Sequence, residues 1–181
     1  MNWQKQSKKL LAGCAIMIAA GVIGGMYAGL STASGQEAPV NERTGQVWNV
    51  PTANQAATIA QYAVAKPEFI PSGFVSVGNI AVIRHRVPGD VFTVVQTWRD
   101  SANKSTEISL VQNPELDGVA GGEPTEIRGV TGQKVLNPAF ESRPELLSLY
   151  WREGGMSYVL TGTVNSVVDE ETLRKVALSV K

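Results

Sequence analysis

Two stretches of the chain carry apolar residues at the spacing of one helical face. The first follows Thr52, a suitable N-cap, and is expected to end at Pro67. Its apolar positions are Ala56, Ile59, Ala60 and Ala63. The second follows Asp169, and acidic residues in its first turn suit the helix dipole. Its apolar positions are Leu173, Val176, Ala177 and Val180. We therefore predict one helix on each side of the intervening segment.

The segment between these helices alternates apolar and polar positions or forms short β-branched runs, which is typical of strands. The expected strands are 80–86, 91–98, 105–112, 126–130, 133–136, 146–152 and 156–161. The expected turns include Pro88-Gly89-Asp90, Thr131-Gly132 and Glu153-Gly154-Gly155. Connections this short join antiparallel strands. The pattern predicts an α+β domain, a curved antiparallel sheet of about seven strands with an N-terminal and a C-terminal helix packed on it.

One further stretch, from Leu10 to Leu30, is apolar throughout and carries no charge. A helix of this length spans about 30 Å, the thickness of the hydrocarbon core of a bilayer. Lys5, Lys8 and Lys9 precede it, so the positive-inside rule places the N-terminus in the cytoplasm. The chain is then expected to comprise a cytoplasmic tail (1–9), a transmembrane helix (10–30), a flexible tether (31–50) and an extracytoplasmic domain (51–181).

Two features of the apolar stretch leave alternatives open. Small residues near Ser34 fit a signal-peptide cleavage site, which would release a secreted form in place of an anchored one. Gly21, Gly25 and Gly29 recur every four residues and favour a helix-packing seam, including a homodimer through the membrane helix. The alternative for these glycines is that Gly is simply common in membrane helices.

The composition of the chain excludes several classes of binding site and catalytic site. Lys+Arg and Asp+Glu number 16 each, so there is no basic footprint for nucleic acid. Cys14 is the only cysteine and His85 the only histidine. A cysteine–histidine zinc site has no ligand set, and cysteine catalysis outside the membrane is excluded. We expect no enzyme activity, no catalytic residues, no cofactor and no metal.

Four aromatic residues on the expected strands remain as candidates for a binding site. They are Trp98, Tyr150, Trp151 and Tyr158. Core packing is the simpler interpretation, and the alternative is an apolar ligand lining on the concave face of the sheet. Tyr150 and Trp151 are adjacent, so they point to opposite faces.

Three passages together resemble a known family. They are QAATIAQYAVAKPEFIPSGF, the turn IRGVTGQ, and LSLYWREGGMSYVLTGTV followed by DEETLRKVALSV. They look like a bacterial family of membrane-anchored extracytoplasmic domains of unknown function, often linked to anti-sigma factors. That family is similar to the LolA-like and RseB-like group, which implies a curved sheet that cups a helix. It has no established catalytic residues to carry over.

These observations favour a single-pass, membrane-anchored binding or sensing module that acts through protein or lipid contacts in the cell envelope. The alternative is an accessory or structural subunit of a membrane protein complex.

Overall fold

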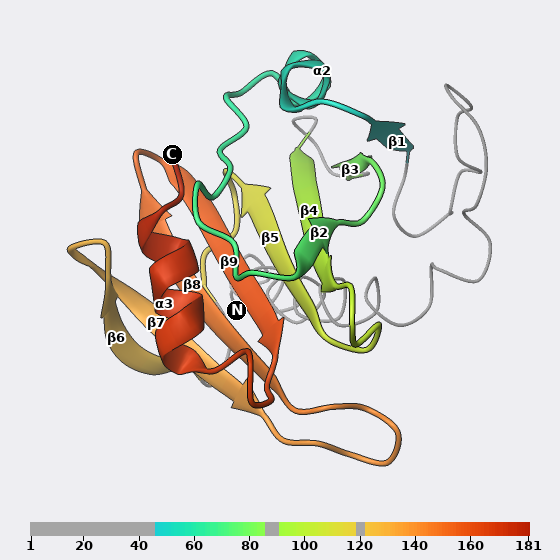
Figure 1. Ribbon diagram of the computed structural model, residues 1–181. Helices are drawn as coiled ribbons and strands as arrows, with labels where there is room; N and C mark the ends of the chain where they lie inside the picture. Colours follow the sequence, from blue (N-terminus) through green and yellow to red (C-terminus); the bar gives the residue numbers. More distant parts are fainter. Residues whose placement is uncertain (1–45, 86–90, 119–121) are drawn as a thin grey trace.

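The computed structural model describes residues 46–85, 91–118 and 122–181, which form one antiparallel sheet and two helices (Figure 1). The helices are α2 (Ala53–Ala60) and α3 (Glu170–Leu178). The strands are β1 (Val47–Val50), β2 (Phe74–Ser76), β3 (Ile80–Arg84), β4 (Phe92–Asp100), β5 (Glu107–Asn113), β6 (Glu123–Ile127), β7 (Val130–Asn137), β8 (Leu146–Glu153) and β9 (Met156–Thr163). The α+β class and the antiparallel sheet with its two helices are confirmed.

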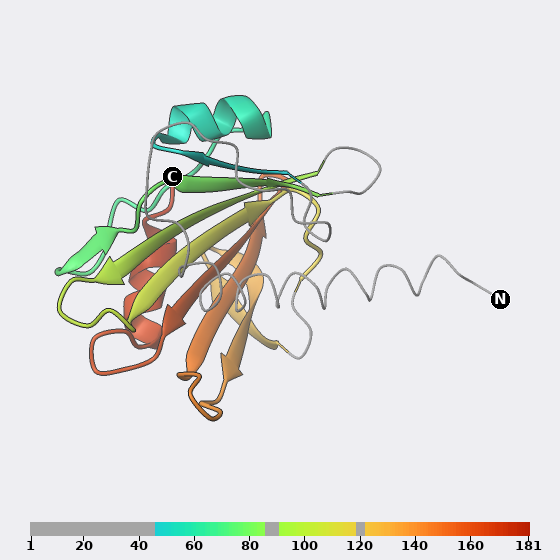
Figure 2. The same ribbon diagram turned by 90° about the vertical axis from the view of Figure 1, so that its right-hand side faces the viewer.

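The sheet runs in the order β1-β3-β4-β5-β9-β8-β7-β6, and β2 pairs with β4 beside this path. Most neighbours are hairpins. The exceptions are the pairings of β1 with β3, of β2 with β4 and of β5 with β9, and the last of these makes β9 a central strand. Figure 2 shows the strands fanning across the sheet.

The described part has nine strands where about seven were expected. The additional ones are β1 and β2, with four and three residues. Neither is long enough to display a clear alternation, and each is held mainly by its partner, β3 or β4. Because β1 pairs with β3, the sheet begins within the last residues of the expected tether, and Trp48 packs against Phe92.

The hairpin between β6 and β7 was placed wrongly by the sequence pattern. Its turn lies at Arg128-Gly129, whose φ angles are 56° and 76°, and not at Thr131-Gly132. Gly132 instead lies inside β7, where an added Cβ would collide with the carbonyl oxygen of Tyr150. Gly132 therefore allows β7 to pass close to β8, and it does not form the turn. The expected Gly154-Gly155 turn is confirmed, and both its φ angles are positive.

The first helix is shorter than expected. Thr52 caps it, and its hydroxyl accepts from the backbone N–H of Gln55 at 3.3 Å. The helix then ends at Ala60 because Gln61 adopts the left-handed conformation, with φ 63°. The expected end at Pro67 is therefore wrong, and Ala63 lies after the end of the helix.

Both helices pack on the same face of the sheet. Ala56 and Ala60 of α2 pack on Val82 and Val94. The apolar side of α3 packs on the central strands, and its buried residues are Leu173, Val176 and Ala177. Asp169 caps α3 as expected, and its carboxylate accepts from the N–H of Thr172 at 2.7 Å.

The opposite face of the sheet has apolar clusters of its own. One contains Val47, Ile83 and Val95. The other contains Leu116, from the connection between β5 and β6, packed on Tyr150 and Val159. Apolar side chains thus lie on both faces of the sheet, because neighbouring apolar residues of a strand point to opposite faces.

The expected transmembrane helix, residues 10–30, and its glycines lie outside the described residues, as do the tail and the turn Pro88-Gly89-Asp90. Among the described residues, neither helix has the length and apolar character needed to span a bilayer.

Candidate functional site

Residues 61–67, called the linker below, cross the helix-covered face of the sheet between α2 and α3. Side chains of the sheet hold them in place. Gln96 donates from Nε2 to the carbonyl oxygen of Ala65 at 2.7 Å, and Gln112 donates from Nε2 to that of Ala63 at 3.3 Å. These bonds replace the intrahelical partners that the backbone loses after Gln61.

The far end of the linker is fixed by the last residues of the chain. Lys66 and Lys181 exchange two backbone hydrogen bonds, at 3.0 and 3.1 Å. Pro67 and Val180 form an antiparallel bridge there. Side chains of the sheet thus hold the middle of the linker, and backbone contacts hold its far end.

An aromatic cluster lies under and beside the linker. Gln112, Tyr158 and Trp151 are direct neighbours across β5, β9 and β8, so they lie in one row on the helix-covered face. Trp151 is fully buried, and the ring of Tyr158 stacks on it with a centroid distance of 5.0 Å and an interplanar angle of 13°. Together with Tyr62 from the linker, these three residues are called the Tyr158 cluster.

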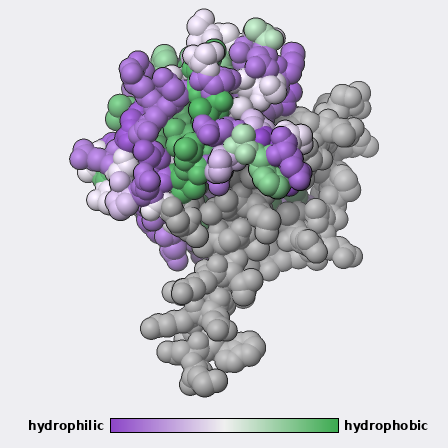
Figure 3. Space-filling model, turned by 90° about the horizontal axis from the view of Figure 1, so that it is seen from below, coloured by the Kyte–Doolittle hydropathy of each residue, from purple (hydrophilic) through white to green (hydrophobic). Residues whose placement is uncertain are grey.

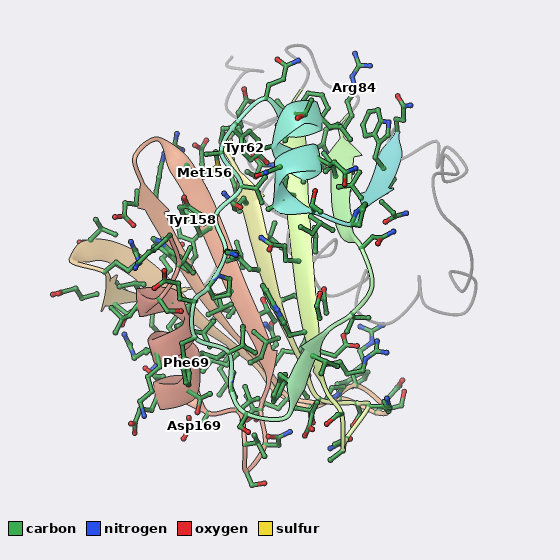
Figure 4. The ribbon with its side chains drawn as sticks, turned by 45° about the horizontal axis from the view of Figure 1, so that its top comes forward. Tyr62, Phe69, Arg84, Met156, Tyr158 and Asp169 are labelled. Carbon is green, nitrogen blue, oxygen red and sulfur yellow. The ribbon has the colours of Figure 1, made fainter. Side chains whose placement is uncertain are left out.

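Figure 4 shows Tyr62, Met156 and Tyr158 one after another between α2 and the beginning of β9. Tyr62 and Tyr158 are half-buried, and so is Met156, which shares the face of Tyr158. The cluster thus reaches from the core to the surface through side chains with apolar bodies and polar tips.

The Tyr62 hydroxyl lies 3.1 Å from the carbonyl oxygens of both Phe92 and Gln112. Burial raises the pKa of Tyr62 well above its ordinary value, and the nearby Tyr158 adds to this. Burial also raises the pKa of Tyr158, and the carboxylate of Glu153 raises it further, while Arg128 opposes both. Both phenols are therefore neutral donors near neutral pH.

Two buried polar atoms of the cluster have no hydrogen-bond partner within the described part of the chain. They are Oε1 of Gln112 and Nε1 of Trp151. Gln112 is 1% exposed and Trp151 0%. A buried acceptor and a buried donor without partners cost free energy, and such groups call for an explanation.

The four aromatic residues expected to line a site do not all meet. Trp151 and Tyr158 stack on each other. Tyr150 is on the opposite face, where its hydroxyl donates to the carbonyl oxygen of Leu116 at 2.9 Å. Trp98 shares the helix-covered face but pairs with Ile108, which pairs with Gly162, four residues from Tyr158 and thus about 13 Å along the strand.

Two members of the cluster were missed in the sequence. Tyr62 appeared to be a helix residue outside the apolar stripe, and Gln112 a polar strand end. Only the left-handed Gln61 and the pairing of β5 with β9 bring them together, and neither has a signal in the sequence pattern.

His85 lies just after β3, and its Nε2 is 2.7 Å from the Thr93 hydroxyl. It is on the opposite side of the sheet from the cluster, since Thr93 is adjacent to Val94 in β4. Across the described ranges, no group of three histidine, cysteine or acidic residues is placed to hold a metal ion.

A second surface feature lies at the other end of the molecule. Figure 3 shows an apolar strip between hydrophilic margins when that end is viewed from below. Phe140, in the connection between β7 and β8, is 66% exposed, and Val167, before α3, is 45% exposed. Figure 1 draws both connections at this lower end, away from the first residues of β9.

Comparison with known proteins gives no relative. No protein-family model, no curated protein and no solved structure matches the chain.

Proposed function

We propose that this chain is a single-pass, membrane-anchored module of the cell envelope that binds a partly apolar ligand at the Tyr158 cluster. The anchor is the apolar stretch 10–30 with lysines before it. The domain then works outside the cytoplasm by contact with a lipid or an envelope protein, without turnover. The resemblance to the LolA-like and RseB-like group agrees with this proposal.

The observation that carries the proposal is the composition of the Tyr158 cluster. A half-buried tyrosine covers a fully buried tryptophan, and two polar atoms beside it lack partners. A core built only for stability favours apolar packing or satisfied polar groups at such positions. Apolar walls with a few convergent polar groups are typical of ligand sites.

The test is ligand retention by the full chain. The protein is purified from membranes in a mild detergent, and the molecules that co-purify are extracted and quantified by mass spectrometry. We expect a species in near-stoichiometric amount that is lost from Tyr158→Ala. Phe140→Ala is the matched control, since Phe140 is an exposed aromatic residue at the other end of the molecule.

Both variants must first show wild-type thermal unfolding. Equal extracts from the wild type and both folded variants would refute binding at the Tyr158 cluster.

A further inference from the structure

We propose that two copies of this chain associate in one membrane by pairing their β1 strands edge to edge, antiparallel and about a twofold axis. The sheet of one copy then continues into the sheet of the other. This inference takes the membrane anchor from the proposed function, and it does not depend on binding at the Tyr158 cluster.

The sheet has two outer edges, β1 and β6, and Figure 1 shows them on opposite sides of the molecule. The β6 edge is closed to a further strand. Ile127 and Val130 form the hydrogen-bonded pair next to a two-residue turn, so Glu126 and Pro124 point their backbone groups away from β7. Pro124 has no N–H to donate, and the carbonyl oxygen of Glu126 accepts from Arg174 Nη1 at 2.9 Å. Both devices protect an edge strand from pairing.

The β1 edge has neither device. The N–H of Arg84 donates to the carbonyl oxygen of Gln46 at 2.9 Å, which begins the ladder between β3 and β1. Because hydrogen-bonded pairs alternate along antiparallel strands, Trp48 points its backbone groups toward β3, while Val47 and Asn49 point theirs outward. Among the described residues, none bonds to these outward groups. The strand also contains no proline and no charge.

A second β1 matches this edge when Trp48 of one copy lies opposite Trp48 of the other. Val47 then pairs with Asn49 of the second copy, and Asn49 with its Val47, and each pair exchanges two backbone hydrogen bonds. Trp48 is half-buried, on the helix-covered face, with its ring centroid 6.2 Å from that of Phe92. Aromatic pairs across antiparallel strands are stabilising, and a twofold axis lets one patch serve both copies.

The position of the anchor favours a second copy over an unrelated strand. In the sequence, β1 is the described element nearest to the expected membrane helix. In the twofold pair the two Gln46 residues lie about 13 Å apart along the strand direction, four residue spacings. Residues 31–45 extend to at most about 50 Å, so both chains reach the same bilayer.

The size of the contact decides where the pair forms. Two four-residue strands and one aromatic pair bury far less than the roughly 1,000 Å² expected of a stable interface in solution. Chains anchored in one membrane meet at a much higher effective concentration. We therefore place the association in the membrane.

The experiment measures energy transfer between full chains in phosphatidylcholine liposomes at decreasing protein-to-lipid ratios. Donor and acceptor dyes are attached at Ser101→Cys, on an exposed turn, in a Cys14→Ser background. Asn49→Pro removes an outward N–H and leaves the bonds to β3 intact, so it should weaken association about tenfold. Asn49→Ala keeps this N–H and is the matched control, with association at the wild-type level.

A second variant tests the register without a proline. The Cα atoms of a non-hydrogen-bonded antiparallel pair lie about 4.5 Å apart, within the range of a disulfide. In the Cys14→Ser background, mild oxidation of membranes should therefore produce a disulfide-linked dimer from Trp48→Cys. Glu126→Cys is the matched control, because Glu126 is exposed on the protected edge strand β6, and it should stay monomeric.

Either of two results would overturn the pairing of β1 strands. One is equal association of the wild type, Asn49→Pro and Asn49→Ala, once all three show the same thermal unfolding. The other is cross-linking of Trp48→Cys no stronger than that of Glu126→Cys, and this result decides if Asn49→Pro does not fold. Neither result affects a Tyr158-dependent extract, so the proposed function would stand in both cases.

Discussion

At the scale of single residues, Gly162 decides how closely α3 approaches the sheet. A Cβ at this position would lie 2.7 Å from Val168 Cγ1 and 2.8 Å from Leu173 Cδ2, and both partners are fully buried. We expect Gly162→Ala to lower the free energy of unfolding by about 1–3 kcal/mol through overpacking. Denaturant titration measures this loss.

A double-mutant cycle provides the control for Gly162. Leu173→Ala removes one of the two colliding side chains, so Gly162→Ala should cost at least about 0.5 kcal/mol less in that background. If the cost is the same in both backgrounds, α3 is not held at this distance by Gly162.

His85 makes the free energy of unfolding of the domain depend on pH. Burial lowers the pKa of His85 below its ordinary value of 6.5, so the folded state holds the proton less well than the unfolded state does. The stabilisation is fully present above about pH 6.5 and is lost as the pH falls through that region. We expect His85→Gln to lose less unfolding free energy than the wild type between pH 7.5 and pH 5. Denaturant titrations at both pH values measure these losses, and equal losses in the two proteins would contradict this.

At the scale of elements, Arg128 ties three ends of the fold together. It lies in the turn between β6 and β7, pairs with Glu153 at the β8–β9 hairpin, and donates to the last carbonyl groups of α3. Its side chain is only 22% exposed. Arg128→Ala should lower the free energy of unfolding by about 1–2 kcal/mol, because the carbonyl groups lose a charged donor.

Lys175→Ala is the matched control for Arg128. Lys175 pairs with Glu171 on the exposed side of α3, and pairs of this kind contribute little. The denaturation midpoint should stay at the wild-type value for Lys175→Ala and fall for Arg128→Ala. A similar midpoint for both variants would show that Arg128 does not join these elements.

Local signals predicted some elements and failed at others for a physical reason. The caps Thr52 and Asp169 and the Gly154-Gly155 turn act through their immediate neighbours, so they could be recognised. Gly132 and Gly162 look like turn or strand breakers in a sequence, but their role comes from β8 and α3, which lie elsewhere in the chain. The Tyr158 cluster could be predicted only as far as Trp151 and Tyr158, on one hairpin.

At the scale of the whole molecule, the anchor and its orientation remain a prediction of the sequence. Cys14 is the only cysteine, so a Cys14→Ser chain offers a clean background for labelling. With Ser101→Cys, on an exposed turn, a membrane-impermeant maleimide should label intact cells. With Ser7→Cys, labelling should need lysis. The reverse pattern would place the domain in the cytosol and remove the basis for an envelope function.

The two backbone hydrogen bonds between Lys66 and Lys181 affect the stage of synthesis at which the domain can fold. The linker beside Tyr158 is anchored by residues that lie more than a hundred positions downstream of it, and the central strand β9 also follows most of the sheet in the sequence. A nascent chain that has left the ribosome only as far as β8 lacks the strand that joins β5 to β8. Its aromatic side chains are then still exposed and accessible to chaperones. Because pairings between distant segments form slowly, this domain should fold only after β9 and Lys181 have been synthesised.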